Sequence, residues 1–276
     1  MPDHPHSLER DIATMLDVAA SRRQSLRWLL AGAAAVPLAG CGGAASVTSE
    51  TLDSRSTSAA CSLIPAETAG PYPADGSNSN GNGVANALIL AGIVRSDIRS
   101  SIGGASASAV APGVPLTIRL TLVNVNAGCA PLAGAAVYLW HCDRDGNYSL
   151  YSSAVAGENY LRGVQESDSG GVVTFSTIFP GCYAGRMPHV HLEVYPSLAA
   201  ATRAGNRIRT SQLGFPTATL SEAYGASGYG ASVRNLAGMS YATDNVFGDG
   251  SAQQIASISG SAALGFAASL QVGVAA

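Results

Sequence analysis

One short segment near the middle of this chain constrains both its fold and its chemistry. From Val190 to Val194 the residues alternate and include β-branched side chains, a pattern typical of a β-strand. Side chains two positions apart on a strand share a face, so His189 and His191 point the same way. The apolar residues between and after them point into the opposite layer. Two imidazoles on one face of a strand can bind a single metal ion.

The other histidines do not compete with this pair. The chain has five, of which His4 and His6 lie in a predicted leader. His141 faces away from its neighbour Trp140, and we interpret it as structural. The alternative for the pair itself is two ordinary strand residues, one packed and one solvated. Tyr183 and Arg186 lie just before the pair and make that alternative weaker; Tyr183 and a second tyrosine, Tyr148, can complete a ligand set.

The first part of the chain resembles an export signal. Residues 21–27 resemble a twin-arginine signal, and an apolar run over 28–39 is too short and too rich in Ala and Gly for a good membrane span. The run ends at Cys41 in a sequence that resembles a bacterial lipoprotein box. We therefore expect residues 1–41 to be a leader and Cys41 to carry a lipid. The alternative is a plain secretory signal with Cys41 as an ordinary thiol.

The predicted location is the periplasm or cell envelope, with membrane contact only through the lipid anchor. Residues 42–60 are rich in Ser, Thr, Ala and Gly and predict a flexible tether. Residues 61–276 have the size of one β-sandwich or barrel domain with a sizeable core. The formal charge of −3, only 12% charged residues and the absence of lysine argue against nucleic-acid binding.

The cysteines predict disulfides rather than a metal site. Four follow Cys41, and an even number in an exported protein suggests two bridges, with three pairings open. No Cys-x-x-Cys spacing supports metal binding by sulfur. The four are Cys61, Cys129, Cys142 and Cys182.

Strand-like segments separated by Pro, Gly and Asn turns recur without an alternating helical pattern. This favours an all-β fold, a β-sandwich of mixed sheets in which long loops carry the metal site. We expect a polar loop over residues 74–84 and only short helical turns over 217–237. The predicted strands are 87–95, 115–124, 135–142, 171–178, 189–195, 207–215 and 265–274.

Several short motifs occur together and in order along the chain. They are Thr68-Ala69-Gly70-Pro71-Tyr72, Gly146-Asn147-Tyr148-Ser149, Pro180-Gly181-Cys182-Tyr183, Arg186-Met187-Pro188-His189-Val190-His191, Arg209-Thr210-Ser211-Gln212-Leu213 and Asp244-Asn245-Val246-Phe247. Together they resemble the intradiol ring-cleaving dioxygenases, the family of protocatechuate 3,4-dioxygenase and catechol 1,2-dioxygenase. The resemblance covers roughly residues 61 to 274 and implies a β-sandwich.

The resemblance implies a mononuclear Fe(III) site. Its ligands would be Tyr148, Tyr183, His189 and His191. Two phenolates and two imidazoles make a hard, electron-rich donor set that favours Fe(III) over Fe(II). The implied reaction joins a small aromatic diol with O2, cleaves the ring between the two hydroxylated carbons and gives a cis,cis-muconate-type diacid.

The resemblance also assigns roles beyond the ligands. Tyr183 would serve as a base, and Arg186 would stabilise charge on the substrate ring; its alternative is a surface or salt-bridge arginine. Gln212 would position a ligand or the substrate, unless it is an ordinary polar strand residue. Glu193 shares the face of the histidines, but we interpret it as a solvated carboxylate at the strand end. The substrate pocket would be lined by Gly70, Pro71 and Tyr72.

Two other functions stay open at this point. One is a metal-free β-sandwich carrier or binding module of the cell envelope. The other is a zinc or copper enzyme, which needs a carboxylate, cysteine or third histidine beside the pair and leaves the tyrosines unused. Because one chain carries both the pocket motif and the four ligands, it can act alone or as a homo-oligomer. The substituents on the aromatic ring stay open.

Overall fold

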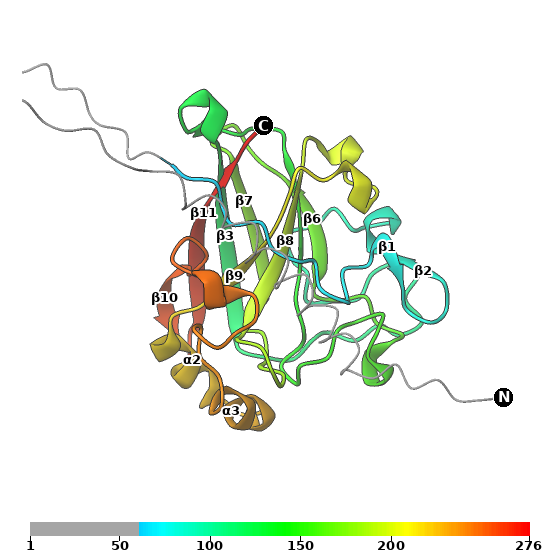
Figure 1. Ribbon diagram of the computed structural model, residues 1–276. Helices are drawn as coiled ribbons and strands as arrows, with labels where there is room; N and C mark the ends of the chain where they lie inside the picture. The colour runs from blue at the N-terminus through cyan, green and yellow to red at the C-terminus, as the bar shows by residue number, and fades with distance from the viewer. Residues whose placement is uncertain (1–60) are drawn as a thin grey trace, which may run out of the picture. The chain divides into compact units, whose positions relative to one another are not determined.

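Alternation of buried and outward-facing side chains along strand β3 (Pro115–Asn124) explains why this chain forms two layers. Leu116, Ile118, Leu120 and Leu122 are all buried. An apolar row of this kind must be covered by a second apolar surface. In the computed structural model, which describes residues 61–276, that surface is a second β-sheet packed against the first (Figure 1).

The first sheet is mixed. Its strands run in the order β10-β11-β3-β4, and β7 pairs with β3 on the same side as β4. The β11–β3 pair is parallel over nine residue pairs, and the other pairs are antiparallel. Besides β3, the members are β4 (Ala130–Pro131), β7 (Val172–Ile178), β10 (Ser257–Ser261) and β11 (Gly265–Val274).

The second sheet is antiparallel throughout and has the order β6-β5-β8-β9. Strand β8 lies in its interior and pairs with β5 on one side and β9 on the other. All seven residues of β8 are buried. The members are β5 (Ala136–Trp140), β6 (Arg162–Glu166), β8 (His189–Tyr195) and β9 (Arg209–Gly214).

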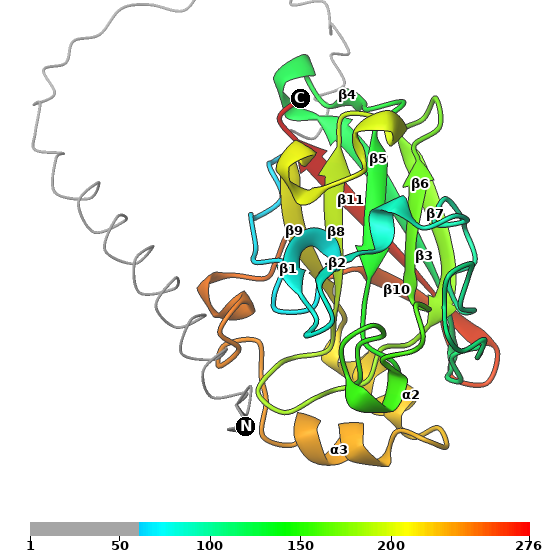
Figure 2. The same ribbon diagram turned by 90° about the vertical axis from the view of Figure 1, so that its right-hand side faces the viewer.

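Strand β8 is buried on both faces because each face is covered differently. Its Val190, Leu192 and Val194 belong to the large core between the two sheets. The opposite face of the second sheet carries Tyr138 and Trp140 and is covered by a separate apolar cluster. Figure 2 shows the hairpin of β1 and β2 lying over this sheet. The hairpin strands are β1 (Asp75–Ser79) and β2 (Val84–Asn86), and the cluster also includes Ala87, Leu88 and Ile93 from the segment that follows.

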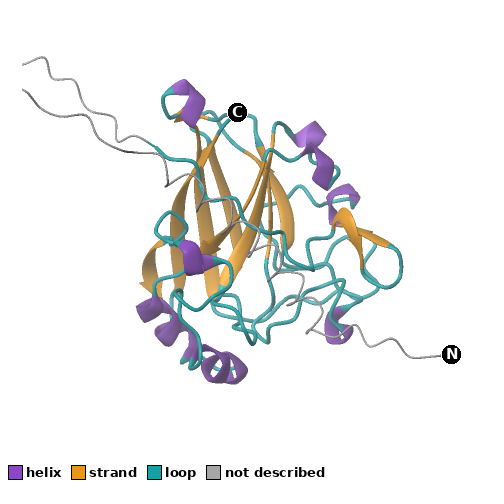
Figure 3. Ribbon diagram, viewed as in Figure 1, coloured by secondary structure: helices purple, strands orange, loops and turns teal. Residues whose placement is uncertain are grey.

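Helices are short and lie at the periphery of the sheets (Figure 3). Within residues 61–276, none is long and apolar enough to cross a membrane. The α-helices of the described residues are α2 (Thr217–Tyr224) and α3 (Gly230–Leu236). The 3-10 helices are η1 (Ala87–Ile89), η2 (Val125–Ala127), η3 (Ser153–Val155), η4 (Leu198–Ala200), η5 (Ala204–Asn206) and η6 (Phe247–Asp249).

The predicted β-sandwich is confirmed, with one mixed and one antiparallel sheet, and so are most of its strands. The strands predicted at 115–124, 189–195 and 265–274 have those bounds in the structure. The strand predicted at 87–95 is wrong: that stretch holds η1, and Val94 makes only an isolated bridge to Val164. The segment 74–84, predicted to be a loop, instead holds most of the β1–β2 hairpin. The polar residues of β1 form a strand because they pair with β2, which the local sequence does not reveal.

The prediction of two disulfides is also wrong. Cys61 and Cys129 form one bridge, whereas Cys142 and Cys182 are buried free thiols. The two thiols belong to different apolar clusters, Cys142 to the one on the outer face of the second sheet and Cys182 to the core between the sheets. An even count of cysteines therefore overstated the number of bridges. The predicted leader, the lipid site at Cys41 and the tether lie outside the described residues.

His141 gives the fold a defined sensitivity to acid. Its Nδ1 donates to the Cys142 carbonyl oxygen at 2.7 Å, and its Nε2 accepts from the Thr177 hydroxyl at 2.7 Å. Burial lowers the pKa of His141 from its ordinary 6.5 to about 4. The unfolded chain therefore binds a proton first, and the free energy of unfolding falls as the pH drops from about 6.5 towards 4.

The substitution His141→Gln should remove this part of the pH dependence. We expect wild type to lose about 3 kcal/mol more than the variant between pH 6.5 and 4, since one pKa unit corresponds to about 1.4 kcal/mol. Urea unfolding of both iron-free proteins at a series of pH values measures the difference. Parallel pH profiles would contradict a neutral, buried His141.

Candidate metal centre

Strand β8 places two imidazoles side by side on the outer face of the second sheet. His189 is the first residue of β8, opposite Gly214 of β9, and His191 lies opposite Gln212 on one side and Trp140 on the other. The Nε2 atoms of the two histidines are 3.1 Å apart. Both side chains are almost fully buried, with 2% and 3% exposed. The predicted common orientation of the pair is thus confirmed.

The two imidazoles are held in different ways. Nδ1 of His189 donates to the carbonyl oxygen of Met187 at 2.6 Å, which leaves a lone pair on Nε2. His191 stacks on Trp140, with 4.8 Å between ring centres and 4° between planes, and Trp140 stacks in turn on Tyr138. Nδ1 of His191 has no hydrogen-bond partner within residues 61–276. A hydrogen bond therefore fixes the first ring and aromatic stacking the second.

Tyr148 reaches the histidines from the loop after β5. The Asp143 carboxylate organises this loop by accepting from the backbone N–H groups of Asp145 and Asn147. The Tyr148 hydroxyl oxygen lies 3.4 Å from Nε2 of His189, and only 2% of the residue is exposed.

Tyr183 reaches the same atom from the turn that follows β7. The turn packs against the Tyr148 loop at Gly181, whose N–H donates to the Asp143 carbonyl oxygen. A Cβ at position 181 would lie 2.6 Å from the carbonyl oxygen of Arg144, so only glycine fits. The Tyr183 hydroxyl oxygen lies 3.2 Å from Nε2 of His189. Two loops that are far apart in sequence therefore meet at one imidazole.

The positions of the four side chains are better explained by a shared cation than by hydrogen bonds among them. Nε2 of His189 has one lone pair but three polar neighbours within 3.4 Å, so at most one of them can donate to it. Separations of about 3 Å suit donor atoms that each lie about 2 Å from a shared ion. Two phenol oxygens and two imidazole nitrogens are hard donors that suit a trivalent cation such as Fe(III). The donor set thus fits the predicted iron.

Burial keeps all four donors neutral when no cation is present. It lowers the pKa of both histidines well below the ordinary range, with a further contribution from the nearby Arg186 charge. It raises the pKa of Tyr183 to about 12, although Arg186 opposes the rise, and it also raises the pKa of Tyr148 well above its ordinary value. The imidazoles are therefore ready to bind a metal, while ionised phenols need a nearby positive charge.

The ligand set required by a zinc or copper alternative is not found in the described part of the chain. Residues 61–276 hold no group of three or more His, Cys, Asp and Glu side chains that could bind a metal. Glu193, predicted to be solvated, is instead fully buried, and that prediction is wrong. It accepts from the Tyr195 hydroxyl at 2.6 Å and pairs with Arg207 at 3.5 Å, because the β1 segment covers this face of the sheet. Burial and the nearby Asp75 raise its pKa to about 8.

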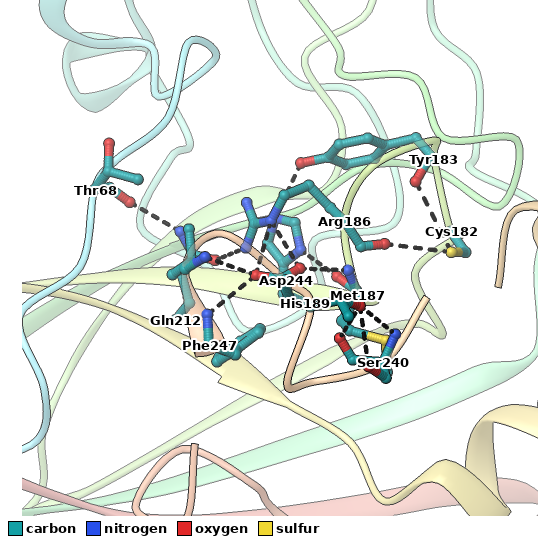
Figure 4. A network of polar contacts seen from close by, with 12 residues as sticks. Thr68, Cys182, Tyr183, Arg186, Met187, His189, Gln212, Ser240, Asp244 and Phe247 are labelled. Atoms are coloured by element: carbon teal, nitrogen blue, oxygen red, sulfur yellow. Dashed lines mark hydrogen bonds and ion pairs between the residues drawn. The ribbon is translucent and has the colours of Figure 1, made fainter. Parts of the chain in front are cut away.

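Arg186 lies near Tyr183 and His189 and is held by two polar partners (Figure 4). Its Nε donates to the Asp244 carboxylate at 3.0 Å, and its Nη2 donates to Oε1 of Gln212 at 2.6 Å. Gln212 in turn donates to the carbonyl oxygen of Thr68 at 3.0 Å. Arg186 is 5% exposed, so its predicted alternative as a surface residue is wrong, whereas the salt bridge is present.

The predicted pocket segment also lies next to the site. The ring of Tyr72 is 5.0 Å from that of Tyr148 and 5.3 Å from that of Tyr151. Gly70 has a φ of 69°, a left-handed conformation that favours glycine, and the carbonyl oxygen of Pro71 accepts from Asn78. This geometry brings Tyr72 against a proposed ligand, while Gly70 and Pro71 shape the backbone that carries it.

Sequence reasoning missed two residues that support the site. Asp244 begins the motif Asp244-Asn245-Val246-Phe247, to which the sequence assigned no role, and its carboxylate pairs with Arg186. Arg162 is 1% exposed and donates to the Tyr72, Pro73 and Ser149 carbonyl oxygens and to the hydroxyls of Ser149 and Tyr138. Arg162 begins β6, a strand that the sequence analysis did not predict, and the local sequence carried no signal of its burial. Its contacts join the pocket segment to the loop of Tyr148.

Comparisons with known proteins converge on one kind of enzyme. A family model described as Dioxygenase matches residues 104–206. The chain is 28% identical to an intradiol ring-cleavage dioxygenase from Tetranychus urticae, covering 78% of this chain and 94% of that one with a TM-score of 0.56. A second dioxygenase structure is 27% identical, with the same coverage and a TM-score of 0.54.

A more distant likeness is to the dioxygenase domain of a carbohydrate-binding fusion from Streptomyces sp. SirexAA-E. It is 21% identical and covers 77% of this chain and 97% of that one, with a TM-score of 0.47. No curated protein sequence gives a significant match.

The contacts of Arg162 predict a large effect on stability. The substitution Arg162→Met should lower the free energy of unfolding by about 3 kcal/mol or more, because it leaves several buried acceptors without donors. Arg119→Met is the control: this exposed arginine lies on β3, and its loss should change stability by less than about 0.5 kcal/mol. Urea denaturation followed by circular dichroism measures both. Equal, small effects would show that the Arg162 contacts do not support the fold.

Proposed function

We propose that this chain is an intradiol ring-cleavage dioxygenase, as its similarity to such enzymes supports, and that it uses Fe(III) held by Tyr148, Tyr183, His189 and His191. It would cleave a small catechol-type aromatic with O2 between the two hydroxylated carbons and release a cis,cis-muconate-type diacid. The observation that carries the proposal is the meeting of three polar atoms around Nε2 of His189, all within 3.4 Å.

Each residue has a defined task in this proposal. Ferric iron, when bound, supplies a Lewis acid that favours the doubly ionised diol and draws electron density from its ring. The Tyr183 hydroxyl oxygen takes up a proton from a substrate hydroxyl, acting as a general base. Tyr148 stays a ligand in this proposal.

Arg186 stabilises the negative charge that develops on the substrate ring. Two of its three nitrogens are engaged by Asp244 and Gln212, which leaves Nη1 for a further contact. A fixed guanidinium in a buried site acts without reorganising during the reaction, and this makes its electrostatic effect large. Gln212 fixes this arginine rather than contacting the histidines, so we propose that it serves the substrate side of the site.

The surroundings favour an aromatic substrate over an extended one. Tyr72, Tyr148 and Tyr151 form a ring cluster beside the donors, and the donors of Arg162 are already committed to protein oxygens. We retain export to the periplasm or cell envelope, with a lipid anchor at Cys41, as part of the proposal. The protein would act alone or as a homo-oligomer. The metal-free carrier has no use for four converging ligands with Arg186.

The two tyrosines should respond differently to loss of their hydroxyls. Tyr148→Phe should weaken iron retention by about 10-fold or more, because it removes a ligand that has no other task. Tyr183→Phe should keep more iron than Tyr148→Phe but slow substrate binding, because the base is lost. Iron analysis and stopped-flow mixing with catechol distinguish the two.

Tyr229→Phe is the matched control for these variants. It removes a buried hydroxyl that donates to the Phe179 carbonyl oxygen in the core, away from the four donors. We expect this variant to keep its iron and its rate of substrate binding. A Tyr183→Phe enzyme as active as wild type would contradict the proposed base.

The purified protein itself tests the proposal. After expression with ample iron it should contain about one iron per chain and show the broad visible charge-transfer band of tyrosinate bound to Fe(III). Oxygen uptake should follow addition of catechol, protocatechuate, hydroxyquinol or a chlorinated catechol, with a muconate-type product. A colourless, iron-free protein without uptake on any of these diols would overturn the proposal.

A further inference from the structure

The guanidinium of Arg186 is aimed by groups that hold two of its edges. Arginine carries five N–H donors in a planar fork, so its direction is set by the partners that engage the fork. Here Asp244 engages the Nε edge at 3.0 Å, and Gln212 engages Nη2 at 2.6 Å. The ring of Phe247 lies 5.9 Å from the guanidinium carbon and limits movement on one side. Figure 4 shows these groups around Arg186.

The Asp244 carboxylate is itself fixed by the backbone. Its Oδ1 accepts from the N–H groups of Val246 and Phe247 at 2.8 and 3.0 Å, and its Oδ2 accepts from the N–H of Met187 at 2.6 Å. The side chain is fully buried. The carboxylate therefore cannot follow the arginine, and the arginine must align to it.

The same carboxylate supplies the counter-charge that a buried cation needs. A buried guanidinium without an anion carries a large desolvation cost and would turn to another acceptor. Asp244 engages Nε and Gln212 engages Nη2, so Nη1 is the nitrogen with no hydrogen bond to either partner and remains for a contact with the substrate.

We propose that Asp244 is a positioning residue. It aims Arg186 at the substrate and keeps the guanidinium from pairing with the tyrosine ligands. The proposal rests on the proposed function, in which Arg186 contacts the reacting ring. Asp244 itself contacts neither substrate nor iron. It acts through Arg186, and loss of the carboxylate lowers kcat only as long as the arginine is present.

A double-mutant cycle tests this dependence. Asp244→Asn, Arg186→Gln and the combination are loaded with iron, and kcat and KM are measured by oxygen uptake. Asp244→Asn should lower kcat by about 100-fold, the size of effect expected from a small misplacement, with a smaller change in KM. The double variant should match Arg186→Gln within about twofold. Equal losses from Asp244→Asn in both backgrounds, or none in wild type, would overturn the proposal.

Matched variants separate positioning from stability. Asp97→Asn removes an exposed Asp–Arg pair with Arg99, 2.7 Å long, and should leave kcat unchanged. If Asp244→Asn does not fold, as shown by thermal unfolding, Asp244→Ser takes its place in the cycle, because its hydroxyl still accepts from the N–H groups of the turn.

The iron-free protein provides a readout that does not depend on activity. In a proton–nitrogen NMR spectrum, the Nε–H of Arg186 should give a slowly exchanging signal that disappears in Arg186→Gln. The signal should exchange faster in Asp244→Asn and stay unchanged in Asp97→Asn. An unaltered signal in Asp244→Asn would overturn the proposal even if no diol is cleaved, whereas absent cleavage with the expected NMR change would count only against the proposed function.

Discussion

Burial of strand β8 on both faces is the constraint on which the rest of the structure depends. Its valines and leucine fill the core between the sheets, so the alternate positions His189, His191 and Glu193 must face the other side. That side is not left to water, because the β1–β2 hairpin and the segment after it cover it. The alternation of the strand thus places two imidazoles in a buried site. There their nitrogen atoms can bind a cation instead of water.

Burial of the site explains which of its side chains are charged and which are neutral. Burial opposes both protonated imidazoles and ionised phenols, so the four donors stay neutral until a strong positive charge is supplied. Arg186, a permanent cation near them, is paired with a buried carboxylate at 3.0 Å. The site therefore carries little net charge of its own, and its electrostatics are set by what it binds.

The sequence predicted the strands with regular alternation and the motifs at the ends of loops. His189 and His191 could be placed on one face because a period of two needs no tertiary information. It could not predict that polar residues 75–79 form a strand, that Glu193 is buried beneath them, or that Cys142 and Cys182 stay unpaired. Each of these depends on which distant segment covers a face. Arg162 was missed for the same reason, since its acceptors come from three separate segments.

Anomalous diffraction at the iron absorption edge, on crystals of the iron-loaded protein, shows directly whether the four side chains bind one iron. We expect a single strong peak within about 2.3 Å of four atoms, namely the hydroxyl oxygens of Tyr148 and Tyr183 and Nε2 of His189 and His191. An iron peak at another position, or an iron-loaded protein in which any of these four side chains points away from the ion, would contradict the proposed metal site.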